Sequence, residues 1–358
     1  MAPRIPGLSG SDEPLTRMFD VALLDLDGVV YVGPHAVPGA APALSQARAA
    51  GQRLAFVTNN AARTPAQVAA HLTELGIPAE PAEVITSSQA AAHHLADRLP
   101  AGAKVLIIGT DGLIDAITER GLVPVYSADD QPSAVVQGYA PNTDWAMLAE
   151  ATIAVRSGVP WVATNLDATL PSPRGPLPGN GSLVAAVRTA TGATPTTTGK
   201  PDPTMHRESV ERSGARAPIV VGDRLDTDIA GATAVGCPSL LVLSGVTDAR
   251  GLLCAPPGQR PDFLGADVAA LLVAHPAATR VAGDRWRCGG WLVRAVGDRF
   301  DVGVTPGPSG DGLDLLRALA AAVWAQAPDR GADPPTLTGS DDASRGELQR
   351  LGLAGRAA

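Results

Sequence analysis

The sequence contains little cysteine, little lysine and no long apolar segment. Its three cysteines are far apart and form no C-x-x-C pair, which argues against a disulfide framework and a zinc site and favours a reducing compartment. Only two lysines, Lys104 and Lys200, stand among its 28 basic residues, so a specific role for either is worth testing. Because no run reaches about 18 apolar residues, no membrane span is expected.

The net charge of −8 argues against partners that are themselves anionic. Without a general basic field, binding to nucleic acid or to a membrane is not expected, and any phosphate must be held locally. The first 17 residues lack the apolar stretch of a signal peptide, with Met18 as an alternative start, so we expect a cytoplasmic protein. With 358 residues, 45% of them hydrophobic, the chain can form two or three domains. A homo-oligomer is compatible with this composition.

Four short apolar runs, each followed by polar residues, predict buried strands at Val21–Leu24, Leu54–Val57, Ile219–Val221 and Leu240–Leu243. Helical patterns separate these runs, and Thr64-Pro65 is a typical helix start. Strands that alternate with helices in this way are typical of an α/β fold with a doubly wound, Rossmann-like parallel sheet. Ligands bind at the carboxyl ends of the strands in such sheets, where these polar residues fall.

A second series of strands and helices follows between Ser87 and Val187. The strands are expected at Val105–Ile108, Val135–Gln137 and Trp161–Thr164, and the helices near Asp111–Arg120 and Asp144–Ser157. We interpret residues 88–187 as an α/β cap domain inserted into a discontinuous core of residues 18–87 and 188–273. The segment Pro171–Gly181, rich in proline and glycine, is expected to be its exit loop.

The pattern changes after residue 275. A β-hairpin is expected over Trp291–Val304, with Gly297-Asp298 as its turn. One face of a following helix is marked by Leu313, Leu316, Leu319 and Val323. These elements predict a small α+β domain over residues 276–358, whose core is expected to contain Trp286, Trp291 and Trp324.

The first candidate site motif is Asp25-Leu26-Asp27-Gly28, directly after a predicted strand. Residues two apart on an extended chain point to the same side, so both carboxylates are expected to face one cavity. Two such carboxylates repel each other unless a cation lies between them or one is protonated. Mg²⁺ prefers carboxylate, phosphate and water oxygens. An acidic loop without a metal is the alternative at this point.

The second motif, Gly222-Asp223-Arg224-Leu225-Asp226-Thr227-Asp228, follows another predicted strand. Asp223, at the strand end, is well placed to reach the same cavity as Asp25. Asp226 is explained equally well by a solvated turn with helix-capping carboxylates.

Two further motifs are Thr58-Asn59-Asn60 and Gly199-Lys200-Pro201. A hydroxyl and free backbone N–H groups near a helix start suit a phosphate, although a plain Asx turn explains the first motif equally well. The second is not a Walker loop, because Gly192 stands seven residues before Gly199 and a proline follows the lysine. A solvated lysine is the usual alternative, and the rarity of lysine in this chain weakens it.

The motifs and their order resemble those of haloacid dehalogenase-like phosphatases. Along the chain, they are strand–DxDG, strand–TNN, an insert, GKP and strand–GDRxDTD. The chain is similar to the branch with a large α/β cap, which contains nitrophenyl phosphatases, phosphoglycolate phosphatases and NagD-like proteins. The resemblance covers roughly residues 18–273. It implies Mg²⁺-dependent hydrolysis of a small organic phosphomonoester through an aspartyl-phosphate intermediate.

By this resemblance, Asp25 is the nucleophile that attacks phosphorus. Asp27 would protonate the leaving oxygen and then accept a proton from the hydrolytic water, since one residue must act first as acid and then as base. Mg²⁺ would be held by Asp25, the backbone carbonyl of Asp27 and Asp223, with Asp228 in support.

The resemblance also assigns the groups that bind substrate. Lys200, Thr58 and Asn59, together with Asn60, would hold the phosphoryl oxygens, because phosphoryl transfer chiefly needs positioning and neutralised charge. Asn165, at the end of a cap strand, would face the substrate. A cap that closes over the core favours small substrates.

By a further resemblance, glycerol 3-phosphate is the expected substrate, although spacing and composition alone do not choose among the candidates. The alanine-rich composition with arginine in place of lysine is typical of actinobacteria, and the C-terminal domain resembles a fragment of an acetyltransferase fold. Both are similar to phosphatases that act on glycerol 3-phosphate in phospholipid turnover; 2-phosphoglycolate and nucleoside monophosphates are the alternatives. Gln349–Ala354 fits the letters of a coenzyme A loop, but only four residues follow it, so no acetyl transfer is expected.

Other classes of protein fit less well. An NAD-dependent oxidoreductase needs G-x-G-x-x-G after the first strand, where Asp25–Val30 has no such loop. A receiver-type signalling module lacks a cap insert and the second acidic residue. The non-enzyme alternative is an inactive, phosphatase-fold binding protein, although none of the motifs is lost.

Overall fold

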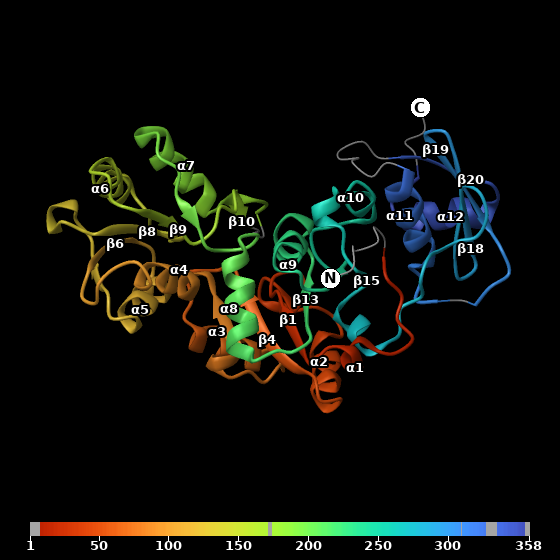
Figure 1. The fold of residues 1–358 in the computed structure, drawn as a ribbon, viewed down its shortest axis with the longest axis horizontal. Helices are drawn as coiled ribbons and strands as arrows, with labels where there is room; N and C mark the ends of the chain where they lie inside the picture. The colour runs from red at the N-terminus through yellow and green to blue at the C-terminus, as the bar shows by residue number, and fades with distance from the viewer. Residues whose placement is uncertain (1–7, 171–173, 309, 327–334, 355–358) are drawn as a thin grey trace. The chain divides into compact units, whose positions relative to one another are not determined.

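The structure, a computed structural model, describes residues 8–170, 174–308, 310–326 and 335–354. The chain divides into two compact units (Figure 1). The first unit contains the chain up to Val32, Ala36–Leu54 and the chain from Arg216 onward, and the second contains Gly33–His35 and Ala55–Ala215.

The first unit is built on parallel strands that lie in the order β15, β14, β13, β1. Their bounds are β1 Val21–Leu24, β13 Pro218–Gly222, β14 Ser239–Val242 and β15 Phe263–Gly265. Helices and single turns connect them: α1 Leu15–Met18, α2 Ala40–Ala49, a π-helical turn Leu225–Ile229, α9 Ala230–Val235 and α10 Ala249–Leu253. All residues of β1 and β14 are buried, as continuous apolar runs in a parallel sheet require. The carboxyl ends of these strands therefore lie along one edge.

The C-terminal part of the first unit has its own sheet, in the order β16, β17, β18, β19, β20. The bounds are β16 Thr279–Arg280, β17 Arg285–Cys288, β18 Trp291–Val296, β19 Arg299–Val304 and β20 Thr336–Gly339, with helices α11 Asp314–Gln326 and α12 Asp342–Arg350. The predicted hairpin is present as the antiparallel pair β18 and β19. The segment Gln349–Leu353 lies at the end of α12 and not at the start of a helix, unlike a coenzyme A loop.

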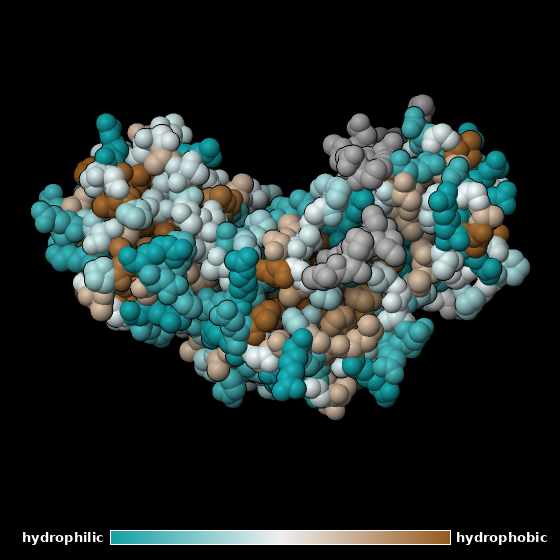
Figure 2. Space-filling model, in the orientation of Figure 1, coloured by the Kyte–Doolittle hydropathy of each residue, from teal (hydrophilic) through white to brown (hydrophobic). Residues whose placement is uncertain are grey.

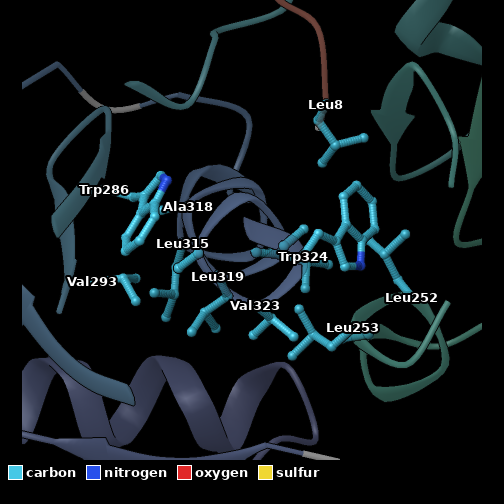
Figure 3. Close-up of a cluster of buried hydrophobic side chains, with 14 of the residues drawn as sticks. Leu8, Leu252, Leu253, Trp286, Val293, Leu315, Ala318, Leu319, Val323 and Trp324 are labelled. Atoms are coloured by element: carbon cyan, nitrogen blue, oxygen red, sulfur yellow. The ribbon is translucent and has the colours of Figure 1, made fainter. Parts of the chain in front are cut away.

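Helix α11 is buried more completely than its sequence pattern predicts. Four apolar positions mark one face, yet nearly every residue from Asp314 to Trp324 is buried. The reason is that α11 packs against β17 and β18 and also against α10. Figure 3 shows Trp324 of α11 beside Leu252 and Leu253 of α10. One hydrophobic cluster, which we call the shared core, thus joins the C-terminal sheet to the parallel sheet.

The second unit contains a parallel pair of strands, β4 and β5, and a five-stranded parallel sheet in the order β12, β9, β8, β6, β7. The strands are β4 Arg53–Thr58, which begins in the first unit, β5 Val84–Thr86, β6 Lys104–Ile108, β7 Val123–Val125, β8 Ala134–Gln137, β9 Trp161–Ala163 and β12 Thr196–Thr197. The helices are α3 Pro65–Glu74, α4 Ser87–Ala96, α5 Asp111–Glu119, α6 Trp145–Arg156, α7 Asn180–Thr191 and α8 Pro203–Ser213. Separate apolar clusters cover the two faces of the larger sheet, one with α4 and α5 and the other with α6 and α7.

The expected exit loop at Pro171–Gly181 contains more regular structure than its composition suggests. Residues 171–173 lie outside the described residues. The rest includes β11 Leu177–Pro178, which pairs antiparallel with β10 Thr169–Leu170, directly before the segment. Helix α7 already begins at Asn180, with Gly179 at its N-cap. A Cβ on Gly179 would lie 2.4 Å from the Asp167 carbonyl oxygen, so glycine is needed for close backbone packing there.

Figure 2 shows hydrophobic residues on the visible face as small patches among hydrophilic ones. Among the described residues, Trp145, at the start of α6, is the most exposed large apolar side chain, with 82% exposure. Within the described ranges, no helix is long and apolar enough to cross a membrane.

Candidate active site

Three aspartates in the first unit bring their carboxylates together. Asp25 follows β1, Asp223 follows β13, and Asp228 lies in the π-helical turn after β13. One carboxylate oxygen from each lies within 4.8 Å of the others. Asp223 and Asp228 are each 1% exposed. Buried carboxylates this close repel one another strongly without a cation, and an all-oxygen donor set is what Mg²⁺ or Ca²⁺ prefers. These residues therefore fit a divalent metal ion.

Glycines create the space that this carboxylate cluster occupies. A Cβ on Gly245 would lie 2.0 Å from Asp223 Oδ2, and one on Gly28 would lie 2.4 Å from the same oxygen. A Cβ on Gly222 would lie 2.2 Å from Asp228 Cβ. Gly28 also has φ of +83°, a conformation that favours glycine.

The loop after β14 fixes the orientation of Asp223. The backbone N–H of Val246 donates to Asp223 Oδ2 at 2.6 Å, and that of Thr247 donates to the Asp223 carbonyl at 3.1 Å. Ser244 Oγ donates to the Gly28 carbonyl at 2.7 Å, which ties this loop to the one after β1. From the sequence, Ser244 is only one of the polar residues that follow the predicted strand Leu240–Leu243, and no role is predicted for its loop.

The other two acidic residues of these motifs differ from the cluster. Asp226 turns to Arg224, whose guanidinium donates to both of its oxygens at 3.1 and 2.9 Å, and this hydrogen bonding holds the pKa of Asp226 below its usual range. Asp226 is therefore a residue of a solvated turn, which is the alternative that the sequence offers for it. Asp27 is exposed and is not one of the three clustered carboxylates, and its backbone forms a bridge with Tyr31.

In the second unit, Asn59 and Lys200 are joined by two hydrogen bonds. The Lys200 N–H donates to Asn59 Oδ1 at 2.8 Å, and Asn59 Nδ2 donates to the Lys200 carbonyl at 3.1 Å. The Lys200 ammonium donates to the Val57 carbonyl at 3.2 Å, and the residue is 3% exposed. Lys200 is therefore not a solvated lysine. Lys104, by contrast, is exposed and donates to the Asp130 carbonyl at 3.0 Å.

Asn165 is also brought to Asn59. Its Nδ2 donates to the Asn59 carbonyl at 2.8 Å, and Ser87 Oγ donates to the same oxygen at 2.7 Å. Asn59 Nδ2 makes a further hydrogen bond to Asp167 Oδ2, at 3.2 Å. From the sequence, neither Ser87 nor Asp167 is a predicted site residue. Asp167 lies three residues after the predicted strand Trp161–Thr164, whereas no strand is predicted before Ser87.

Thr58 and Asn60 form local turns. Thr58 is buried at the end of β4, and its Oγ1 accepts from the Asn60 N–H at 3.0 Å. Asn60 is exposed, and its Oδ1 accepts from the Ala62 N–H at 2.8 Å, which is an Asx turn. Helix α3 then begins with a capping box between Thr64 and Gln67.

Parallel strands with nearby carboxylates at their ends form a site that fits a divalent metal ion, and comparison with protein families identifies the class of protein. Residues 22–123 match the family described as haloacid dehalogenase-like hydrolase, and residues 197–271 match a related hydrolase model. Residues 288–353 match the GCN5-related N-acetyltransferase-like domain.

Curated relatives cover most of this chain. It is 47% identical over 344 residues to a D-glycerol 3-phosphate phosphatase of Mycobacterium tuberculosis, covering 95% of this chain and 96% of that protein. It is 37% identical over 233 residues to an acid sugar phosphatase of Staphylococcus aureus, covering 64% and 89%. The chain therefore belongs to the haloacid dehalogenase-like hydrolases.

Solved structures are also similar. The glycerol phosphate phosphatase from Mycobacterium tuberculosis in complex with magnesium has a TM-score of 0.86 and 45% identity, covering 95% of this chain and 99% of that one. The 4-nitrophenylphosphatase from Thermotoga maritima has a TM-score of 0.67 and 30% identity, covering 72% and 98%. The first of these covers the C-terminal sheet as well as the phosphatase motifs.

Proposed function

We propose that this protein is a Mg²⁺-dependent phosphoric monoester hydrolase whose substrate is glycerol 3-phosphate. The carboxylate cluster of Asp25, Asp223 and Asp228 is the observation that carries the hydrolase assignment, because it fits a divalent metal at the strand ends. The substrate assignment is supported by the 47% identity to a D-glycerol 3-phosphate phosphatase along almost the whole chain.

In the reaction that we propose, an Asp25 carboxylate oxygen attacks phosphorus as the bond from phosphorus to the glycerol oxygen breaks. Asp27 gives its proton to that leaving oxygen, and glycerol is released. Asp27 then takes a proton from water, whose oxygen attacks phosphorus and displaces the Asp25 carboxylate, giving inorganic phosphate.

The other assigned residues bind and orient. Asp25, the Asp27 carbonyl and Asp223, with Asp228 in support, would hold Mg²⁺, which supplies positive charge beside the phosphoryl oxygens. Lys200 and the donors of Thr58, Asn59 and Asn60 would hold the remaining oxygens, and Asn165 would lie toward the substrate.

We extend the proposal to the organisation of the chain. Residues 18–87 and 188–273 would form the phosphatase core, residues 88–187 the cap and residues 276–358 the C-terminal domain. We propose a cytoplasmic location and a small phosphomonoester as the partner, with neither nucleic acid nor membrane bound, in keeping with the net charge of −8. A homo-oligomer is compatible with this proposal.

The test is phosphate release by purified protein with Mg²⁺ from glycerol 3-phosphate, 2-phosphoglycolate, nucleoside monophosphates, sugar phosphates and p-nitrophenyl phosphate. Asp25→Asn should abolish release, whereas Asp226→Asn is the matched control, because that exposed carboxylate pairs only locally with Arg224. Equal release from wild type and Asp25→Asn would contradict the nucleophile assignment. No release from any substrate would favour the inactive binding protein, and a preference for a sugar phosphate would replace the substrate assignment.

A further inference from the structure

We propose that Asn59 is a positioning residue that fixes Lys200 for phosphoryl transfer, and that its side-chain amide does not itself bind substrate. The inference rests on the proposed function, in which Lys200 holds phosphoryl oxygens. It reassigns one residue of the T-N-N motif, since the resemblance alone would have its side chain donate to phosphate.

The hydrogen bonds of the Asn59 amide carry the argument. An asparagine amide has two N–H donors and one carbonyl oxygen. Here Oδ1 accepts from the Lys200 N–H at 2.8 Å, and Nδ2 donates to the Lys200 carbonyl at 3.1 Å and to Asp167 Oδ2 at 3.2 Å. Both donors are thus engaged within the protein, which leaves none of them for a phosphate.

The Asn59 side chain forms hydrogen bonds to both the N–H and the carbonyl of Lys200, as the backbone of a neighbouring strand does in a β-sheet. These bonds fix the backbone N–H and carbonyl of Lys200, while the ammonium group of Lys200 donates to the Val57 carbonyl at 3.2 Å. Gly199, which precedes Lys200, permits the close approach of Asn59. A Cβ on Gly199 would lie 2.2 Å from the Thr164 carbonyl oxygen and 2.8 Å from Asn59 Oδ1. The lysine is therefore pre-organised, which is how charged groups contribute most to a transition state.

Asp167 determines which way the amide faces. An ionised carboxylate only accepts hydrogen bonds, so it selects the orientation that places Nδ2 toward Asp167 and Oδ1 toward the Lys200 N–H. The Asn59 backbone is fixed as well, because its carbonyl accepts from Ser87 Oγ at 2.7 Å and from Asn165 Nδ2 at 2.8 Å. Asp167, Asn59 and Lys200 thus form a connected series, with Asn59 in the middle.

The experiment is a double-mutant cycle of Asn59→Asp and Asp167→Asn, assayed on glycerol 3-phosphate with Mg²⁺. Asn59→Asp replaces the NH2 group, which carries both donors, with an acceptor oxygen. The kcat should therefore fall by about 10²-fold, as for a misplaced catalytic group, with KM changed less than about threefold. Adding Asp167→Asn exchanges the amide and the carboxylate and restores one donor–acceptor pair. The double variant should therefore recover kcat at least about fivefold over Asn59→Asp. Asn142→Asp, an exposed asparagine in the same unit, is the matched control and should keep wild-type kcat.

Each outcome decides the question. If wild type releases no phosphate from any tested substrate, the proposed function fails. If wild type is active and Asn59→Asp keeps its kcat, or if the two losses simply multiply in the double variant, the positioning role is wrong. Thermal unfolding reports whether each variant folds. Should Asn59→Asp not fold, Asn59→Ser takes its place. This change replaces the amide with a single hydroxyl, so it should lose about tenfold in kcat, and wild-type kcat in this variant would contradict the proposal.

Discussion

Replacing Trp324 with alanine should destabilise the whole first unit. Trp324 is 1% exposed and is the largest fully buried side chain among the described residues. It packs in the shared core beside Leu252 and Leu253 (Figure 3). The Arg260 guanidinium also lies 5.2 Å from its ring centroid. Removal of a buried tryptophan side chain costs about 3–5 kcal/mol in the free energy of unfolding.

One feature places the expected cost at the lower end of that range. The buried indole N–H of Trp324 has no hydrogen-bond acceptor within the described part of the chain. An unsatisfied buried donor costs about 1–3 kcal/mol, and the substitution removes that cost together with the ring. We therefore expect a loss of about 3 kcal/mol, or a midpoint of thermal unfolding lowered by about 6–12 °C.

The assay follows tryptophan fluorescence and residual phosphatase activity over the same temperature series. If the shared core makes the C-terminal sheet and the parallel sheet one cooperative body, both signals should shift together in Trp324→Ala. Trp145→Ala, the same change at a side chain with 82% exposure, should change the free energy of unfolding by less than about 0.5 kcal/mol. Two separate transitions, with activity surviving the first, would show that the C-terminal sheet unfolds independently and would contradict this reasoning.

Three further predictions concern the metal site, a buried histidine and a buried thiol. Gly245→Ala places a Cβ 2.0 Å from Asp223 Oδ2, so the Mg²⁺ concentration for half-maximal activity should rise by about tenfold or more. Burial lowers the pKa of His275 in the folded protein, so as the pH falls the unfolded chain binds this proton first. The free energy of unfolding, measured with denaturant, should therefore fall as the pH drops below about 6.5. Burial, with the nearby Asp314 carboxylate, raises the pKa of Cys288 to about 12, so iodoacetamide at pH 8 should modify it only after unfolding, as peptide mass spectrometry would detect.

Matched controls distinguish these effects from general damage. Gly258→Ala adds a Cβ where no atom lies within 4 Å, so equal loss of Mg²⁺ activation there would contradict the role given to Gly245. His275→Gln should flatten the stability profile between pH 7 and pH 5.5, whereas a change at exposed His35 should not; an unchanged slope in His275→Gln would disprove the linkage. Cys254 is less buried than Cys288, so faster native alkylation of Cys288 would contradict the third prediction.

The sequence predicts the longer buried elements well, because apolar runs and helix caps are local signals. The strands at Val21–Leu24 and Trp291–Val296 have the predicted bounds. Among the short strands, Val123–Val125 is interrupted by a central proline and Thr196–Thr197 contains no apolar residue. They form because a neighbouring strand supplies their hydrogen bonds. Nothing local indicates them.

The same distinction holds within the candidate site. The positions of Asp25 and Asp223 follow from strand ends, so sequence motifs find them. The hydrogen bonds of Asn59 join residues 108 and 141 positions apart in the chain. Their donor and acceptor roles depend on how three distant loops meet, which no spacing rule encodes. A motif therefore identifies a residue as part of the site more readily than it identifies what its atoms contact.

The scarcity of lysine gives the protein an unusual surface chemistry. Of its two ε-amino groups, the one on Lys200 is enclosed, whereas Lys104 is exposed at the start of β6. An amine-reactive dye or support applied to the folded protein therefore has a single side-chain target, in addition to the α-amino group. Attachment at Lys104 would place a reporter at a known position in the second unit, and it would leave the buried lysine and its hydrogen bonds to Asn59 unmodified.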